Sequence, residues 1–556
     1  MASYIIGGLS RLSVRVSKLL LDEGDDVVVL VYPGEEDLRH LLDPRVGIGE
    51  LSGDRERAMR EAGIERAECL LALGEDDLEN LRTLVAGTAA APEVPLVLRA
   101  FDPTLAEQLT RHGRLRRAFS VSALAAPAFV VAGLGGEVDE TMRLGDTEVP
   151  MARLQLAPGS PLAGTTVRQI ESKYGCVVLA EAPSGGDWRP VQDLDRGIAS
   201  GERVAVGGPV SHVLKLAEQA AANPGHDHSP RVKRRRDLRQ RISGPLAVSV
   251  GLLVFVLLAM VVAFAIDLHI GLIHAFYVAI LTAFGSGPVD PNSPTHAGLK
   301  VFAILALIAS GVLVGAVFSF ATAAVTTDRL QRREARRIAK LRGHAVVAGL
   351  DNVGYRLEQV LHGMGVPTVT IDSEVDPRYS TALAARTPFV QGDPRIRENL
   401  ERAGLDRAGL LFAVTGDELL NVEVCLQARS VNPRVRTVAR VFDEDFAEDA
   451  SRTLGIDATL STSMAAATAF ASAATDEKAV RRFVLGSLGM GVRRLDVSRS
   501  IARREVEAWS EVGVRVAAYR TRAHGVVPPT AMPDVLEPGD HLIVAGPEEA
   551  VRRTGM

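Results

Sequence analysis

Cysteine and aromatic side chains are scarce in this chain of 556 residues. The three cysteines, Cys69, Cys176 and Cys425, lie far apart without CxxC spacing. This excludes a disulfide framework and a cysteine-bound zinc site, and it favours a reducing compartment. Phe, Trp and Tyr make up only 4% of the residues, and the formal net charge is −5. Because nucleic-acid binding relies on an excess of basic side chains, we expect no nucleic-acid partner.

We also expect neither a secretory signal nor a catalytic constellation. Met1–Ile6 lacks the basic region and cleavage site of a signal peptide. His226 and His228 lie in a stretch rich in Pro, Gly and Ser, and His344 precedes a predicted strand, where we expect an exposed or capping side chain. Hydride transfer needs an acid/base pair beside a substrate pocket, and none stands out. We therefore predict no catalytic residue, no metal site and no enzyme, with a membrane-anchored NAD-binding enzyme as a minor alternative.

Charge is absent from a long stretch in the middle of the chain. Pro245–Ile266 has 22 residues without a charged side chain, and a helix of this length spans about 33 Å, enough for a bilayer core. Leu299–Val325 carries only Lys300. The apolar segment His274–Gly287 between them is too short to cross. Two spanning helices with a re-entrant segment between them are typical of a tetrameric cation pore.

Basic clusters flank both apolar runs, at 231–241 and 329–342, whereas the region between the runs has no arginine. The positive-inside rule then places both basic flanks in the cytoplasm. With two crossings, both large soluble portions lie on the same side. We expect a multi-pass protein of the inner cell membrane, in contact with lipid, with both termini cytoplasmic.

The two soluble portions repeat each other. Tyr4–Ser13 matches Ala345–Gly354, and each reads as a short strand, a tight turn and the start of a helix. Further pairs are Asp26–Val31 with Thr368–Asp372, Ala62–Ala67 with Ala403–Ala408, and Val97–Asp102 with Val438–Asp443. Strands that alternate with helices at this spacing predict a doubly wound parallel sheet in each half. A smaller β-rich piece follows each.

With these repeats around a pore-like middle, the chain resembles ion channels with RCK (regulator of conductance of potassium) domains, of the two-transmembrane-helix potassium-channel superfamily. The order is RCK–pore–RCK. The resemblance implies an α/β and membrane α-helical fold, in which two Rossmann-like domains, each with a small α+β C-terminal lobe, flank a two-helix pore with a re-entrant loop. The expected boundaries are 1–140 and 141–222 for the lobes of the first RCK domain, 223–241 for a basic linker, 242–327 for the pore (helices about 245–266 and 299–325, loop about 271–290), 328–342 for a linker to the gate, and 343–475 and 476–556 for the lobes of the second RCK domain.

The second copy carries most of a dinucleotide-binding fingerprint. Gly349 and Gly354 shape the turn, and Asp372 follows Gly349 by 23 residues, where an acid takes the ribose hydroxyls. Asp351 replaces the middle glycine, and its carboxylate repels a phosphate. The cleft then prefers a nucleoside, a dinucleotide displaced from the turn, or a cation that neutralises Asp351. The resemblance implies a nucleotide (NAD/NADH or ATP/ADP) here, and it adds as site positions Asn352, Asp393, Thr415, Asp417 and Arg440.

The first copy departs further from the fingerprint. It keeps Gly8 but has Ser10 and Ser13 in place of the other glycines, and Val31 stands where the ribose acid belongs. Arg11 occupies the position at which many RCK domains hold a phosphate. Two hypotheses stay open: a scaffold that has lost its ligand, which we favour, and a second binding site.

The pore segment also departs from its family. Strict potassium filters use a TVGYG loop, whereas this chain reads Phe284-Gly-Ser-Gly-Pro-Val289, with Gly287 retained and Pro288 interrupting the backbone. Asp290 forms either a ring of four carboxylates or a plain turn. The resemblance implies the following pore residues: Thr282, Phe284, Gly285, Ser286, Gly287 and Asp290.

In the second apolar run, Gly311 and Gly315 form a GxxxG pair that serves either close helix packing or a gating bend. We predict a ligand-gated channel for potassium or, with weak selectivity, monovalent cations. The resemblance implies a homotetramer with an eight-domain RCK gating ring. The alternative is an RCK-type regulatory component of a potassium uptake system with little conductance of its own.

Overall fold

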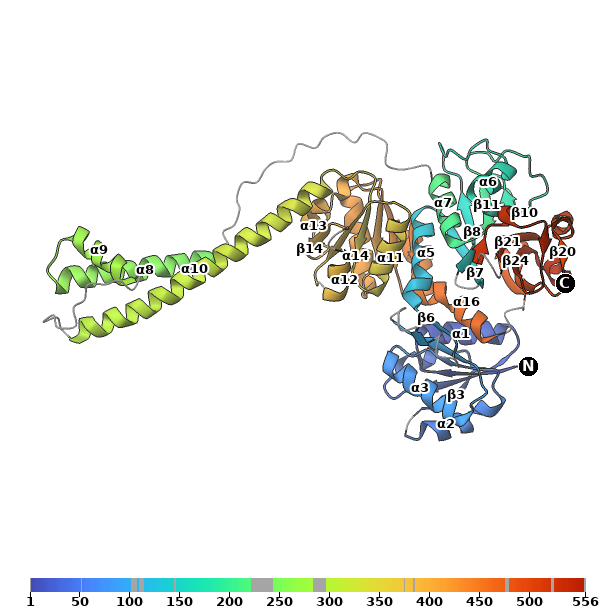
Figure 1. The fold of residues 1–556 in the computed structure, drawn as a ribbon, viewed down its shortest axis with the longest axis horizontal. Helices are drawn as coiled ribbons and strands as arrows, with labels where there is room; N and C mark the ends of the chain where they lie inside the picture. Colours follow the sequence, from blue (N-terminus) through green and yellow to red (C-terminus); the bar gives the residue numbers. More distant parts are fainter. Residues whose placement is uncertain are drawn as a thin grey trace. The chain divides into compact units, whose positions relative to one another are not determined.

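The computed structural model describes residues 2–51, 53–101, 108–109, 115–144, 147–221, 244–283, 297–374, 376–383, 386–475, 480–521 and 525–554. It divides into two compact units, one made of Met1–His228 with Ile338–Met556 and the other of Ser229–Arg337 (Figure 1).

The first half begins with a six-stranded parallel sheet in the order β3-β2-β1-β4-β5-β6. Its strands are rich in Val, Ile and Leu because helices cover both faces. The strands are β1 (Ser3–Gly7), β2 (Asp26–Val31), β3 (Gly47–Glu50), β4 (Cys69–Ala72), β5 (Leu96–Arg99) and β6 (Leu115–Phe119). The helices are α1 (Arg11–Asp22), α2 (Arg55–Glu61), α3 (Asp77–Ala90) and α5 (Val121–Gly133).

The second half repeats this sheet, in the order β14-β13-β12-β15-β16-β17. The strands are β12 (Ala345–Ala348), β13 (Thr368–Asp372), β14 (Phe389–Gln391), β15 (Leu410–Ala413), β16 (Arg436–Arg440) and β17 (Ala458–Leu460). The helices are α11 (Asn352–Gly363), α12 (Pro377–Leu383), α13 (Arg397–Arg402), α14 (Glu418–Val431), α15 (Glu444–Leu454) and α16 (Thr462–Ala474). The equal strand orders confirm the predicted fold class and the internal repeat.

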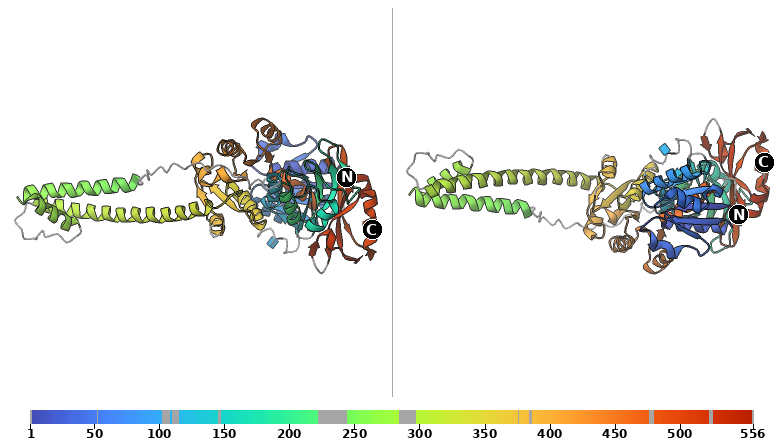
Figure 2. Two further views of the ribbon diagram at one scale, coloured as in Figure 1. Left: turned by 90° about the horizontal axis from the view of Figure 1, so that it is seen from above. Right: turned by 90° about the horizontal axis from the view of Figure 1, so that it is seen from below.

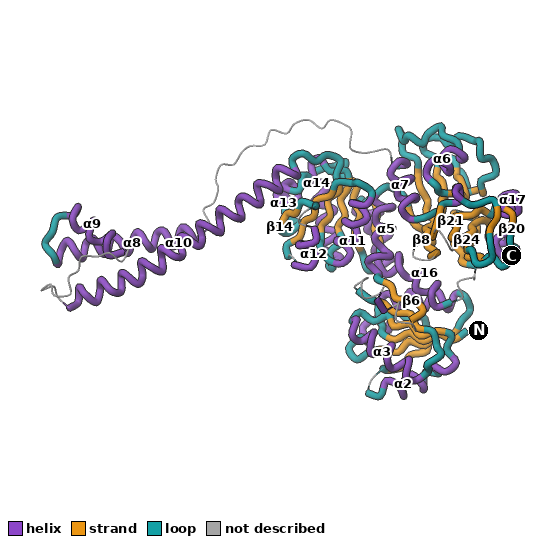
Figure 3. Tube along the Cα trace, in the orientation of Figure 1, coloured by secondary structure: helices purple, strands orange, loops and turns teal. Residues whose placement is uncertain are grey.

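Each half ends in a smaller antiparallel sheet, shown with the other strands in Figure 3. The first, ordered β10-β9-β11-β8-β7, contains β7 (Glu137–Leu144), β8 (Thr147–Gln155), β9 (Val177–Ala182), β10 (Arg189–Pro190) and β11 (Arg203–Gly207), with α6 (Val167–Tyr174) and α7 (Val210–Ala220). The second, ordered β18-β19-β24-β21-β22, contains β18 (Arg481–Leu485), β19 (Leu488–Asp496), β21 (Arg515–Thr521), β22 (Gly525–Val527) and β24 (His541–Pro547), with α17 (Arg503–Glu507) and α18 (Glu548–Arg553). A short pair, β20 (Ile501–Ala502) with β23 (Val535–Leu536), completes it.

The two halves exchange their last Rossmann helices. Helix α5 of the first half packs on α11, β15 and β16 of the second, where a Cβ added to Gly133 would lie 2.6 Å from the ring of Phe412. Helix α16 of the second half packs on α1 and α5 of the first half, and the rings of Phe470 and Phe119 meet edge to face with centroids 5.1 Å apart. Figure 1 shows each helix beside the other half's sheet. Neither Rossmann core is therefore complete without the opposite half.

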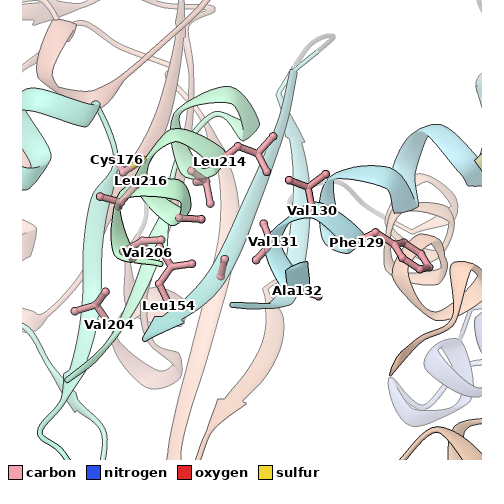
Figure 4. Packing of buried hydrophobic residues seen from close by; sticks show 14 of the residues in the cluster. Phe129, Val130, Val131, Ala132, Leu154, Cys176, Val204, Val206, Leu214 and Leu216 are labelled. Atoms are coloured by element: carbon pink, nitrogen blue, oxygen red, sulfur yellow. The ribbon is translucent and has the colours of Figure 1, made fainter. Parts of the chain in front are cut away.

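Helix α5 also packs against the first small sheet. Residues from Phe129 to Ala132 belong to the same buried cluster as Leu154, Val206 and Leu214, and Figure 4 shows this packing. A mostly apolar helix of Val, Ala and Phe suits this place, because it contacts apolar neighbours on several sides.

The two small sheets share a core of their own, in which Met151 and Leu179 of one join Met490 and Ile543 of the other. An ion pair lies beside it. Arg515 Nη2 lies 2.9 Å from Glu171 Oε2, and both side chains are largely buried. Burial raises the pKa of the Glu171 carboxyl, and the Arg515 guanidinium opposes that rise.

The second unit is helical. It contains α8 (Gly244–Asp267), α9 (Leu272–Ala283) and α10 (Ala297–Ile338), seen from two further sides in Figure 2. Within Val248–Asp267 and Lys300–Ser319, both long and apolar enough to cross a membrane, only 17% of the residues are buried inside the chain. A core helix of a soluble protein would be mostly buried, so these exposed apolar faces suit lipid or neighbouring subunits.

The helix exchange predicts that a cavity made in the second half weakens the first sheet. Phe470→Ala removes a fully buried ring, and such truncations cost about 3–5 kcal/mol. Hydrogen exchange followed by mass spectrometry should show faster exchange in β1 and β4. Phe446→Ala, which truncates a ring that is 40% exposed, is the control and should leave both strands protected. Faster exchange confined to residues 345–556 would contradict the exchange of helices as a stabilising contact.

Candidate nucleotide cleft and pore segment

The carboxyl ends of the second parallel sheet gather most of the predicted site. Gly349 follows β12, Asp372 ends β13, Asp393 comes after β14, Thr415 after β15, and Arg440 ends β16. Ligands of open α/β sheets bind at this edge. The sheet order therefore brings together residues that lie up to 91 positions apart in the chain.

At both glycines of the turn, the surrounding atoms leave no room for a side chain. Gly349 has φ +104°, and a Cβ there would lie 2.8 Å from the backbone nitrogen of Thr415. A Cβ on Gly354 would lie 1.9 Å from the carbonyl oxygen of Gly349, so helix α11 packs on the turn at a distance that only glycine permits. The turn has the close strand-to-helix packing of a dinucleotide-binding fold.

Asp351 is the N-cap of α11. Its Oδ1 accepts hydrogen bonds from the N–H groups of Val353 (2.8 Å) and Gly354 (3.0 Å). Its Oδ2 lies 3.0 Å from Nη1 of Arg440, whose side chain is 15% exposed and lies over the ring of Phe442. A carboxylate thus occupies the donors that a helix N-terminus offers to an anion.

Asp372 is held by the backbone. Its Oδ2 accepts from the N–H of Leu350 at 2.5 Å, and its Oδ1 accepts from the N–H of Glu374 at 3.1 Å. A carboxylate oxygen can accept more than one hydrogen bond. The side chain is therefore fixed beside the turn with acceptor capacity left for a pair of ribose hydroxyls.

The remaining predicted residues are already engaged within the chain. Asp393 pairs with Arg395 at 2.8 Å, Asp417 caps α14 through the N–H of Leu420, and Asn352 accepts from the hydroxyl of Tyr379. Asp351, Asp372, Thr415 and Arg440 lie at the turn, where Asp372 contacts Leu350, Thr415 adjoins Gly349 and Arg440 pairs with Asp351.

Asn421, which no sequence motif pointed to, is a fully buried side chain that joins two strand ends. Its Nδ2 donates to the carbonyls of Thr415 (3.1 Å) and Arg440 (3.0 Å), and its Oδ1 accepts from the Thr415 N–H (2.8 Å). The internal repeat could have pointed to Asn421, because Asn80 of the first copy donates in the same way to the carbonyls of Gly74 and Arg99.

The cleft of the first copy is filled by its own side chains. The ring of Tyr32 lies so close that a Cβ on Gly8 or Gly74 would come within 2.9 or 2.5 Å of it. Its hydroxyl hydrogen-bonds Thr83 Oγ1 at 2.6 Å, and burial raises the pKa of the phenol. Glu35 replaces the missing acid, since its Oε2 accepts from the N–H of Leu9 at 2.6 Å, as Asp372 does from Leu350.

The serine hydroxyls of the glycine turn in the first copy also hydrogen-bond within the chain. Ser10 donates to the carbonyl of Leu73 at 2.7 Å, and Ser13 donates to that of Gly8 at 2.6 Å. Arg11 donates to the carbonyl of Phe442, in the second half, at 2.9 Å. These contacts favour the hypothesis of a first copy that serves as a scaffold.

Of the two alternatives expected for His344, an exposed or a capping side chain, the exposed one is wrong, and the ring instead contacts Ala403, the C-cap residue of α13. The side chain is fully buried, and its Nε2 lies 3.0 Å from the carbonyl oxygen of Ala403. Burial lowers the pKa of this histidine. Among the residues that the structure describes, no three His, Cys, Asp or Glu side chains are grouped to hold a metal ion.

In the helical unit, α9 ends at Ala283, and its last carbonyl accepts from the hydroxyl of the buried Ser310 at 3.2 Å. Thr282 donates to the carbonyl of Val278, so its hydroxyl is used within α9. The C-terminal end of a helix dipole favours cations. The other predicted pore residues lie outside the described residues: Phe284, Gly285, Ser286, Gly287 and Asp290.

Gly311 and Gly315 lie in the unbroken helix α10. A Cβ on either would meet no described atom within 4 Å. The described residues therefore make no close packing at this GxxxG pair, and both the packing role and the gating bend stay predictions.

The TrkA-N domain family matches the chain twice, at residues 4–120 and 345–462. Potassium channel protein 1 of Methanocaldococcus jannaschii is 26% identical over 175 residues, which are 30% of this chain and 51% of that protein. A TrkA homolog of the Trk potassium uptake system from Pyrococcus abyssi is 22% identical over 100 residues, which are 18% and 44%. The chain thus spans about half the length, or less, of the curated relatives it matches.

A solved structure of the GsuK channel has the same fold, with a TM-score of 0.50 at 14% identity over 99% of this chain and 78% of that one. The predicted resemblance of the two soluble halves to one domain family is confirmed at the matched residues. The chain carries two TrkA-N (RCK-type) domains on either side of two helices long and apolar enough to cross a membrane.

Proposed function

We propose that the chain is a subunit of a ligand-gated cation channel of the inner membrane, regulated by a nucleotide in the second TrkA-N domain. One observation carries the proposal. Helix α10 runs without a break from the apolar span to Ile338, which is buried in the core of the second Rossmann sheet. In the proposed channel, a rearrangement of that domain would reach the spanning helix along α10.

A single pair of spanning helices encloses no ion path, so several copies are required. Fourfold symmetry gives one pore and a ring of eight TrkA-N domains on the cytoplasmic side. The exposed apolar side chains of α8 and α10, such as Phe255, Leu258, Val312 and Phe318, would face lipid or neighbouring copies. We retain the domain boundaries expected from the sequence, with both termini cytoplasmic.

The second cleft is the proposed regulatory site. Asp372 beside a glycine turn suits a ribose, and NAD(H) or an adenine nucleotide is the class of ligand we propose. We assign the domains a regulatory rather than catalytic role. The similarity to a TrkA homolog favours one other function, a regulatory component of a potassium uptake system that conducts little by itself.

Ion flux distinguishes these two functions. The purified chain in liposomes should release a potassium gradient, detected by a potassium-sensitive dye after addition of a proton carrier, and native mass spectrometry should give four chains. Liposomes that carry the protein but stay tight, or a stable monomer or dimer, would contradict the channel and favour the uptake component.

The ribose role of Asp372 predicts a loss of nucleotide affinity in Asp372→Asn. The amide keeps an oxygen for the Leu350 N–H but loses the charge, and hydrogen bonds to charged groups contribute about 1.5–3 kcal/mol. Calorimetry with NADH and ADP measures the loss. Val31→Ala, at the matching position of the first copy, should change the affinity little. Equal losses in both variants would show that the two clefts are ranked wrongly.

The pore sequence predicts weak selectivity. Pro288 interrupts the segment that forms carbonyl rings in a strict filter, so ions should pass partly hydrated. Potassium and sodium should then permeate with similar ease, and Asp290→Asn should reduce cation conductance most at low salt, where screening is weakest. Reversal potentials in potassium/sodium gradients measure the ratio. A strong potassium preference would show that the loop still builds a carbonyl cage.

A further inference from the structure

Asp351 stands where phosphate-binding turns of this kind have a glycine, and its carboxylate is bound by the groups that would otherwise receive a phosphate. Its Oδ1 takes the N–H groups of Val353 and Gly354 at the start of α11. A ligand phosphate at this turn would have to displace the carboxylate from both donors.

Arg440, the positively charged side chain of the cleft, also pairs with Asp351. Arg440 Nη1 lies 3.0 Å from Asp351 Oδ2 and 3.5 Å from the carbonyl oxygen of Thr415. The guanidinium carbon lies 5.0 Å from the ring centroid of Phe442, which holds the side chain in place. The positive charge that would attract a phosphate is thus paired within the protein.

The first copy supplies an internal comparison. Its N-cap at the same place is Ser10, which is neutral. The matching arginine, Arg99, does not pair with the N-cap: it lies 4.0 Å from Glu75 and donates to the carbonyl of Leu73 at 3.4 Å. The carboxylate–arginine pair across the turn is therefore a property of the second cleft and not of the shared fold.

On the ribose side of the cleft, no side chain among the described residues pairs with the Asp372 carboxylate. Asp372 is held by two backbone N–H groups, at 2.5 and 3.1 Å, and is only partly buried. At one end of the turn, the Asp351 carboxylate occupies the place of an anion. At the other end, Asp372, the acid expected to recognise vicinal hydroxyls, keeps acceptor capacity for a ligand.

We propose that Asp351 is a built-in substitute for a phosphate, so that the second cleft selects the nucleoside part of its ligand and discriminates against phosphate charge at the turn. This inference rests on the proposed nucleotide function and specifies its ligand class. A ligand binds through a ribose and base, and each phosphate placed at the turn lowers its affinity. Asp351 is thus a specificity-determining residue.

Calorimetry with adenosine and ADP as probes tests the inference on the full chain in detergent. Wild-type protein should bind adenosine at least as tightly as ADP. Asp351→Gly restores the complete glycine turn, frees the two N–H donors and Arg440, and should shift the preference towards ADP by about tenfold or more, or about 1.4 kcal/mol. Glycine is a tolerated N-cap, so the helix should persist.

Two variants serve as controls. Asp351→Asn keeps an N-cap oxygen without the charge, and should shift the preference in the same direction by less. Ser10→Gly makes the matching change in the first copy, where Tyr32 fills the cleft, and should change neither affinity.

The results separate the inference from the function on which it rests. Wild-type protein that binds ADP tenfold more tightly than adenosine, or an unchanged preference in both Asp351 variants, would overturn the role of Asp351 and leave nucleotide regulation standing. A lack of binding of either probe to wild type and to both variants would overturn the proposed nucleotide site itself.

Discussion

The exchange of α5 and α16 is the contact on which the soluble unit depends. Each helix leaves its own Rossmann sheet and covers part of the other, with Phe129 and Phe470 fully buried in the cores they join. The shared core of the two small sheets and the buried Arg515–Glu171 pair add a second connection. Because the two domains share their cores in this way, a ligand bound in one cleft, as proposed, would be expected to affect both halves of the chain.

The repeat itself led to most of this fold. Short Val/Ile strands before a glycine turn predicted two parallel sheets, and the structure shows both sheets with the same strand order. The helix exchange did not follow, because α5 and α16 are apolar on several sides and their sequences do not say which sheet they cover. The sequence left open whether His344 is exposed or capping for a similar reason, since the carbonyl of Ala403 that it contacts lies 59 residues away.

The candidate site shows the same division between local and distant information. Gly349, Gly354 and Asp372 were recognisable because their spacing is local to one βαβ unit. The Asp351–Arg440 pair, the Asn421 bridge and the replacement of an acid by Glu35 join separate strands, so only the fold reveals them. The internal repeat compensates in part, because a side chain kept in both copies, such as Asn80 and Asn421, marks a shared structural need.

A regulatory cleft requires that its ligand distinguish two states of the assembly, since a ligand that binds both equally shifts nothing. Helix α10 is the element through which such a difference would reach the membrane. The most direct measurement is the open probability of single channels in a planar bilayer as adenosine or NADH is added to the side that bears the Rossmann domains. The account predicts a change in open probability that saturates with ligand and is lost in Asp372→Asn. An open probability that does not respond to either ligand, in a channel that conducts, would contradict it.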